Sequence, residues 1–112
     1  EGGWTVDRLK GWGVDTSGIA RLATPTGHAI INVDAAGENA IVLFPGANRA
    51  IPFETVEAAL SGARRGDTLM LQNETAHQAK AAGLARAKGL HVIYSAAPFD
   101  VDAVRATDIP LQ

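Results

Sequence analysis

Polar side chains follow two short apolar runs in this sequence of 112 residues, and their positions favour a binding site. Gln72-Asn73-Glu74 closes the run 68–72, and Ser95-Ala96-Ala97-Pro98 follows the run 91–94. Where such runs are parallel strands, ligands bind beyond their carboxyl ends. Glu74 carries the only charge among these residues, and its carboxylate could accept hydrogen bonds from ligand hydroxyl groups. Alternatively, it stabilises the start of a helix predicted at 75–88, where the helix dipole favours a negative charge.

The other polar and glycine-bearing segments match no pattern of a catalytic or metal site. His28, His77 and His91 are far apart in sequence and the chain has no cysteine, so no metal site is predicted. The segment 34–39 contains two acidic residues but lacks the calcium-loop pattern. Gly46-Ala47-Asn48 matches neither the Walker motif nor the dinucleotide-binding glycine motif, and no nucleophile is recognisably paired with a base. The residues by themselves therefore predict a ligand-facing sheet edge.

The composition indicates a folded chain and excludes several classes of partner. Hydrophobic residues make up 46% of the sequence, charged residues 20%, and the formal net charge is −2. Positive charge is neither in excess nor clustered beyond Arg64-Arg65, so we expect no nucleic-acid partner. No apolar run approaches the ~20 residues of a membrane span, so we expect no membrane association. The absence of cysteine is compatible with a cytoplasmic protein, which is our expectation.

The first half of the chain is expected to contain a helix and a β-hairpin. Residues 4–10 predict a short helix that stops at Gly11 or Gly13, with Trp4 and Trp12 as packing residues. Residues 14–24 alternate loosely and suggest a strand. Two runs rich in β-branched residues, 28–33 and 40–44, flank the turn-forming segment 34–39 and predict a hairpin.

The second half alternates helices with short apolar runs, which indicates a parallel sheet covered by helices and joined by right-handed crossovers. The runs 68–72 and 91–94 are each short enough to be a buried strand. The expected order is helix 52–62, strand 68–72, helix 75–88, strand 91–94, short helix 99–104 and a last strand beginning at 108. The fold class is therefore α/β, with a hairpin in addition to the parallel sheet.

Several short motifs, in register, resemble the ribokinase-like family of PfkB-type carbohydrate kinases. The matching spacing runs from about Val14 to Ile109, and the motifs are Thr26-Gly27, Gly37-Glu38-Asn39, Pro45-Gly46-Ala47-Asn48, Gln72-Asn73-Glu74 and Ala97-Pro98. The chain departs from the family at Ser95-Ala96-Ala97-Pro98, where the family has Asn-Pro-Ala-Pro, so the role of Ser95 is left open.

The resemblance implies part of a ribokinase-like αβα sandwich in which the hairpin belongs to a β-sheet lid. Residues 1–112 would form a single incomplete segment, with the lid hairpin at about 26–48 and the α/β layer at about 52–112. Ala29 and Ile31 would face a sugar from the lid, and Glu74 would hydrogen-bond a sugar hydroxyl. Homodimers would form through the lid hairpin.

The resemblance also implies the reaction. The parent enzyme would use ATP and magnesium, with a monovalent cation as an open question, to convert D-ribose to ribose 5-phosphate. Catalytic, cofactor-binding and metal-binding residues would all lie outside this segment, because the family's motifs for them are missing from it. We therefore expect an internal segment of a larger kinase, inactive alone. Two alternatives stay open: a kinase for another sugar or a nucleoside (fructose, 2-keto-3-deoxygluconate or adenosine), and a non-enzymatic α/β interaction module.

Overall fold

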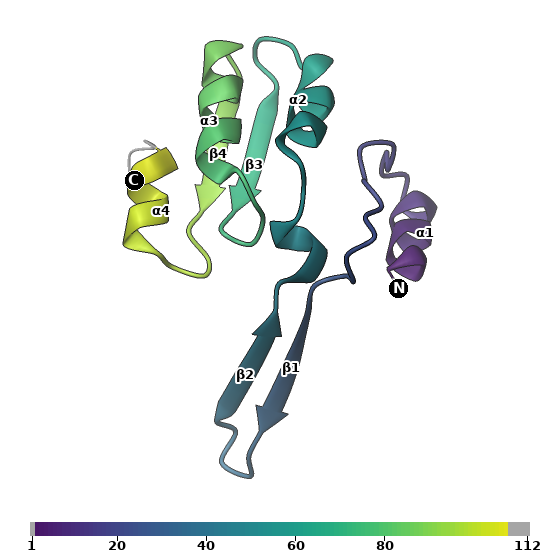
Figure 1. Cartoon of the computed structure of the whole chain (residues 1–112), viewed down its shortest axis with the longest axis vertical. Helices are drawn as coiled ribbons and strands as arrows, with labels where there is room; N and C mark the ends of the chain where they lie inside the picture. Colours follow the sequence, from purple (N-terminus) through teal and green to yellow (C-terminus); the bar gives the residue numbers. More distant parts are fainter. Residues whose placement is uncertain (1, 108–112) are drawn as a thin grey trace. The chain divides into compact units, whose positions relative to one another are not determined.

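The computed structural model describes residues 2–107, which divide into two compact units with the boundary in the sequence between Ala50 and Ile51. Each unit is described by itself. Their elements, labelled in Figure 1, are α1 (Gly3–Gly11), β1 (His28–Val33), β2 (Asn39–Phe44) and the 3-10 turn η1 (Gly46–Arg49) in the first unit, and α2 (Phe53–Ser61), β3 (Thr68–Gln72), α3 (Gln78–Ala87), β4 (His91–Ser95) and α4 (Val101–Thr107) in the second.

The region before the hairpin contains the predicted helix but not the predicted strand. α1 confirms the helix, yet Trp4 and Trp12 are 70% and 68% exposed, so the prediction that they are packing residues is wrong for the described structure. The Arg8 guanidinium instead lies over the Trp12 ring, 5.3 Å from its centroid. No strand forms between residues 14 and 24. There the Asp15 side chain accepts a hydrogen bond from the Ser17 amide at 2.8 Å, a local turn that competes with strand pairing.

The hairpin is confirmed, with β1 and β2 antiparallel and Ile31 opposite Ile41 in register. Its loop is held by Asp34, whose Oδ1 accepts hydrogen bonds from the amides of Ala36 (2.8 Å) and Glu38 (3.0 Å). Gly37 has a φ of +87°, a conformation that glycine adopts at little cost. Asp34 and Gly37 together explain why the chain reverses here.

Close backbone contact joins the two ends of the hairpin. The Ala47 amide donates to the Pro25 carbonyl at 2.8 Å. A Cβ atom on Gly27 would lie only 2.5 Å from the Pro45 carbonyl oxygen, and one on Gly46 would collide with that of Pro25. The Thr-Gly and Pro-Gly-Ala-Asn motifs therefore meet at the base of the hairpin, where only glycine fits.

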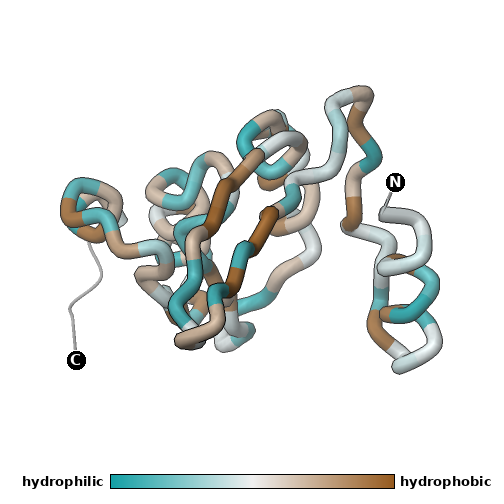
Figure 2. The backbone as a smooth tube through the Cα atoms, turned by 90° about the horizontal axis from the view of Figure 1, so that it is seen from below, coloured by the Kyte–Doolittle hydropathy of each residue, from teal (hydrophilic) through white to brown (hydrophobic). Residues whose placement is uncertain are grey.

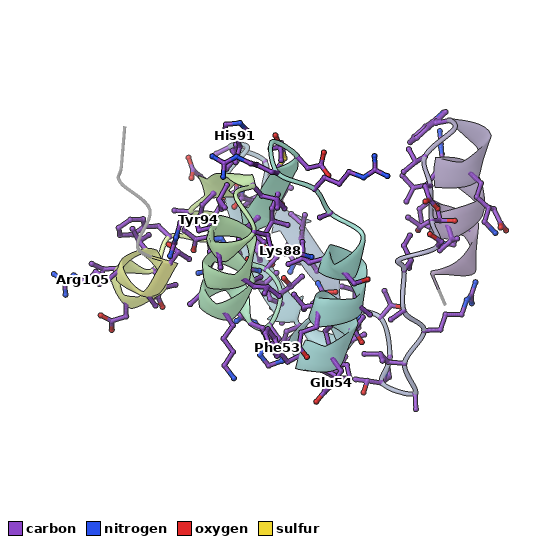
Figure 3. The ribbon with its side chains drawn as sticks, turned by 90° about the horizontal axis from the view of Figure 1, so that it is seen from above. Phe53, Glu54, Lys88, His91, Tyr94 and Arg105 are labelled. Carbon is purple, nitrogen blue, oxygen red and sulfur yellow. The ribbon has the colours of Figure 1, made fainter. Side chains whose placement is uncertain are left out.

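The second unit is a two-stranded parallel sheet packed against helices, with β3 and β4 in register from Thr68–His91 to Gln72–Ser95. Its core consists of Leu60, Ala85 and Leu90, and Val56, Leu69 and Val92 are among the half-buried side chains around it. The Lys88 ammonium group donates hydrogen bonds to the carbonyls of Leu60 and Ser61, which ties the end of α3 to the end of α2 (Figure 3).

The strands of this sheet are buried on one face only, so the expectation of fully buried strands is wrong. Along each strand half-buried and exposed residues alternate. Met70 and Ile93, which are paired in register, are 70% and 52% exposed. Parallel sheets are normally covered on both faces. The exposed face is therefore the kind of surface that a second helical layer covers in an αβα sandwich.

The predicted fold class, α/β with a parallel sheet and a hairpin, is confirmed. Two helix boundaries differ: α3 begins at Gln78 rather than at 75, and α4 spans 101–107 rather than 99–104. The strand predicted from 108 lies outside the described residues. Within the described part of the chain, the helices are too short or too polar to cross a bilayer.

Candidate functional site

The two segments with candidate polar residues lie side by side at the carboxyl ends of β3 and β4. Gln72 and Ser95 are paired at the ends of the strands. Just beyond them, the Asn73 side chain is 6% exposed and its Nδ2 donates a hydrogen bond to the Pro98 carbonyl at 3.0 Å. Asn73 therefore ties one strand-end segment to the other across 25 residues of sequence. The sequence predicted the segment 72–74 as part of a site but not the bond from Asn73 to Pro98. The only signal for that bond in the sequence is the position of Asn73 directly after a strand.

Glu74 lies in the turn between β3 and α3, and its side chain is exposed. The alternative role at the start of the helix is not realised, because α3 begins four residues later and has no acidic residue in its first turn. Among residues 2–107, no partner lies within hydrogen-bond or ion-pair distance of the Glu74 carboxylate. This carboxylate is therefore available to accept hydrogen bonds from a ligand.

Buried polar groups fix the turn on the side of the helix. Gln78 is 7% exposed, and its Nε2 donates to the carbonyl of Thr75 at 3.3 Å and to the Thr75 hydroxyl oxygen. Gln78 Oε1 and the Tyr94 hydroxyl group are buried without a hydrogen-bond partner among the described residues. Tyr94, labelled in Figure 3, comes from β4.

Ala29 and Ile31 lie on one face of the hairpin, as their spacing of two requires. Opposite them in register are Leu43 and Ile41, which are 61% and 51% exposed. This face is apolar except for Asn39, which lies opposite Val33 next to the loop. Figure 2 shows the hydrophobic colouring of both strands. The face offers contact area and no hydrogen-bonding side chain next to Ala29 and Ile31.

The opposite face of the hairpin is also largely apolar. It carries Ile30 and Val42, which are 57% and 62% exposed, and the tilted ring pair of His28 and Phe44 with centroids 5.1 Å apart. The first unit thus exposes apolar side chains on both faces of its hairpin.

No metal centre is present among the described residues, where no three His, Asp or Glu side chains gather closely enough to hold an ion. Within residues 2–107, the carboxyl group with a shifted pKa lies elsewhere. The Ser17 backbone amide, followed by the Ser17 hydroxyl, holds the pKa of Asp15 below its ordinary value of 3.8. Asp15 is a fully exposed turn residue, so its shift belongs to local structure.

Comparison with solved structures supports the family resemblance. The chain is similar to a protein named Sa239 (TM-score 0.79, 29% identity, 88% of this chain and 34% of that one). It is also similar to ribokinase from Giardia lamblia (TM-score 0.72, 26% identity, 90% and 35%) and to ribokinase from Cryptococcus neoformans in complex with ADP (TM-score 0.65, 30% identity, 91% and 33%). No family model matches the sequence, and neither does any curated protein.

These findings define the class: the chain has a ribokinase-like α/β fold that includes the hairpin and part of the parallel sheet. Its specific resemblance to ribokinases, predicted from the sequence motifs, is confirmed. The chain spans about a third of the length of the solved structures that it matches.

Proposed function

We propose that this chain supplies part of the sugar site of an ATP-dependent carbohydrate kinase that phosphorylates D-ribose to ribose 5-phosphate. The observation that supports this most is the exposed Glu74 carboxylate at the carboxyl end of β3, in a chain similar to ribokinases. Open α/β sheets bind their ligands at such strand ends.

In this proposal the sugar is recognised by a charged acceptor and an apolar cover. Glu74 accepts hydrogen bonds from sugar hydroxyls, and Ala29 and Ile31 cover the sugar from the hairpin, which acts as a lid. A carboxylate that pairs with hydroxyl groups discriminates against analogues without them, because the acceptor would be left unpaired once the ligand and the hairpin cover it.

The phosphoryl donor and the assembly complete the proposal. MgATP would supply the phosphoryl group, and none of the residues proposed here holds MgATP. The residues that bind MgATP, and those for any monovalent cation, would belong to a part of the enzyme outside this segment. The apolar hairpin would join two lids in a homodimer. The 112-residue chain alone would have no kinase activity, and we place the enzyme in the cytoplasm.

A chimeric kinase tests the proposal. Residues 26–107 would replace the aligned third of Cryptococcus neoformans ribokinase, and phosphorylation would be measured with D-ribose, fructose, 2-keto-3-deoxygluconate and adenosine. We expect the highest kcat/KM for D-ribose. Preference for another acceptor would favour the alternative kinase, and the 112-residue chain assayed alongside should show no turnover.

Glu74→Gln is the informative variant in this chimera. It keeps the shape of the side chain and removes the negative charge, so we expect KM for the sugar to rise about tenfold, the range for hydrogen bonds to a charged group. Glu57→Gln is the matched control, because Glu57 is also an exposed glutamate but lies on α2. It should leave KM for the sugar unchanged. Equal kinetics for both variants would contradict a sugar-binding role for Glu74.

A second candidate, a non-enzymatic interaction module, is favoured by the apolar side chains exposed on both faces of the hairpin. A chimera that is folded but lacks activity toward every acceptor, while the 112-residue chain binds a partner through its hairpin, would support this candidate instead.

A further inference from the structure

His77 has an unusual conformation for the residue that precedes a helix. Among residues 2–107 it is the only non-glycine residue with a positive φ, at +65°. Its carbonyl accepts the first bond of α3, from the Ala81 amide at 2.9 Å. Residues at this position are usually Ser, Thr, Asp or Asn, whose side chains cap the helix. The His77 side chain makes no such bond, so capping does not explain the histidine.

The imidazole is directed instead at the first residues of the second unit. His77 Nε2 lies 3.0 Å from the Ile51 carbonyl oxygen, a contact between residues 26 apart in sequence. The ring packs edge-on against Phe53 with centroids 5.5 Å apart, and the Lys80 ammonium lies 5.2 Å from the centre of the same Phe53 ring. Because a carbonyl oxygen can only accept, the proton of this hydrogen bond is on Nε2.

This contact completes a set of three that fix the turn of Glu74. Asn73 ties the turn to Pro98 on one side, and the bonds between Gln78 and Thr75 close it on the other. His77 provides the third attachment, to the junction segment, residues 51–53, at which the chain passes from the hairpin unit into the second unit. A side chain in a left-handed conformation costs energy, and these ring contacts offset that cost.

We propose that His77 is a positioning residue for Glu74, whose turn it clamps to the junction segment. The inference rests on the proposed function of Glu74 and adds a residue to it. His77 itself touches no sugar. It holds the Glu74 carboxylate in place and couples its turn to the segment that leads to the hairpin.

The clamp is tested first in the 112-residue chain, without reference to any kinase activity. His77→Phe keeps the flat ring and removes the donor, whereas His77→Gln places an amide donor near the position of Nε2. His91→Phe is the matched control: His91 is exposed at the start of β4, away from Phe53 in Figure 3. We expect a slowly exchanging Nε2 proton on His77 by NMR. Hydrogen exchange in residues 73–77 should be about fivefold faster in His77→Phe, nearly normal in His77→Gln and unchanged in His91→Phe.

The positioning role is tested in the chimeric kinase. His77→Phe should raise KM for the sugar by about two- to tenfold, leave kcat nearly unchanged, and be rescued by His77→Gln. A proton on Nδ1 alone, or unchanged exchange in residues 73–77, would overturn the clamp. Altered exchange with an unchanged KM would overturn the positioning role. A chimera without sugar kinase activity would count against the proposed function, and the exchange measurement would still decide the clamp.

Discussion

Replacing Gly27 by alanine should open the base of the hairpin. The new Cβ would lie 2.5 Å from the Pro45 carbonyl oxygen and 3.0 Å from Asn48 Nδ2. The first distance is far below van der Waals contact and involves a backbone atom, so the chain itself must move. The movement would weaken the bond from the Ala47 amide to the Pro25 carbonyl, 2.8 Å long in the native structure.

The magnitude follows from these two effects. Overpacking costs about 1–3 kcal/mol, and a weakened hydrogen bond adds about 0.5–1 kcal/mol. We take about 2 kcal/mol as the loss, which lowers the protection of the hairpin amides against hydrogen exchange by about thirtyfold.

Two other glycines separate steric from conformational effects. Gly37 has a φ of +87° and open space around it, so Gly37→Ala should cost about 1 kcal/mol from backbone strain alone. Gly18 has neither constraint, and Gly18→Ala should change nothing. The assay is hydrogen exchange of the amides in β1 and β2 at low protein concentration. Equal protection in Gly27→Ala and Gly18→Ala would refute the steric argument.

Three further predictions concern self-association, the second core and pH. The chain should self-associate through its exposed apolar hairpin, in which Ile31 is 58% exposed; sedimentation that shows a monomer at high concentration would contradict this, and Ile31→Lys should shift the equilibrium toward monomer. Leu60→Ala removes a core side chain that is 7% exposed and should destabilise the second unit by about 3 kcal/mol, whereas Leu43→Ala, at 61% exposed, should change denaturant unfolding little. The folded-state pKa of Asp15 lies below its ordinary value of 3.8, so the contribution of Asp15 to stability is present above pH 3.8 and is lost as the pH falls through the folded-state pKa. A carboxyl NMR titration of Asp15 with a midpoint at or above 3.8 would contradict this prediction. Ser17→Ala should raise the pKa of Asp15 only partly, because the backbone amide of residue 17 remains.

Local sequence patterns predicted the elements well where they alone determine the structure. The hairpin followed from β-branched runs around a loop with Asp34 and Gly37, and the helix–strand order of residues 52–104 followed from alternating apolar periodicity. The strand expected at 14–24 does not form, because a hydrogen bond from the Ser17 amide to the Asp15 carboxylate creates a turn that the alternation of residues does not reveal. The sequence did not predict the exposed face of the sheet formed by β3 and β4. An apolar run of about five residues looks the same whether the strand is covered on one face or on both.

For the candidate site, the sequence located the residue but not its supports. Strand-end reasoning and the family resemblance both selected Glu74. The contacts that hold its turn, Asn73 to Pro98 and His77 to Ile51, join residues 25 and 26 apart and have no local signature. The left-handed conformation of His77 also moved the start of α3 to Gln78, because the chain must change direction before the helix begins.

A crystal structure of the chimeric kinase with bound D-ribose tests the central claim most directly. The account predicts a Glu74 carboxylate oxygen within hydrogen-bond distance of a ribose hydroxyl, with Ala29 and Ile31 in van der Waals contact with the sugar. A ribose bound with Glu74 facing solvent and the hairpin out of contact would contradict it.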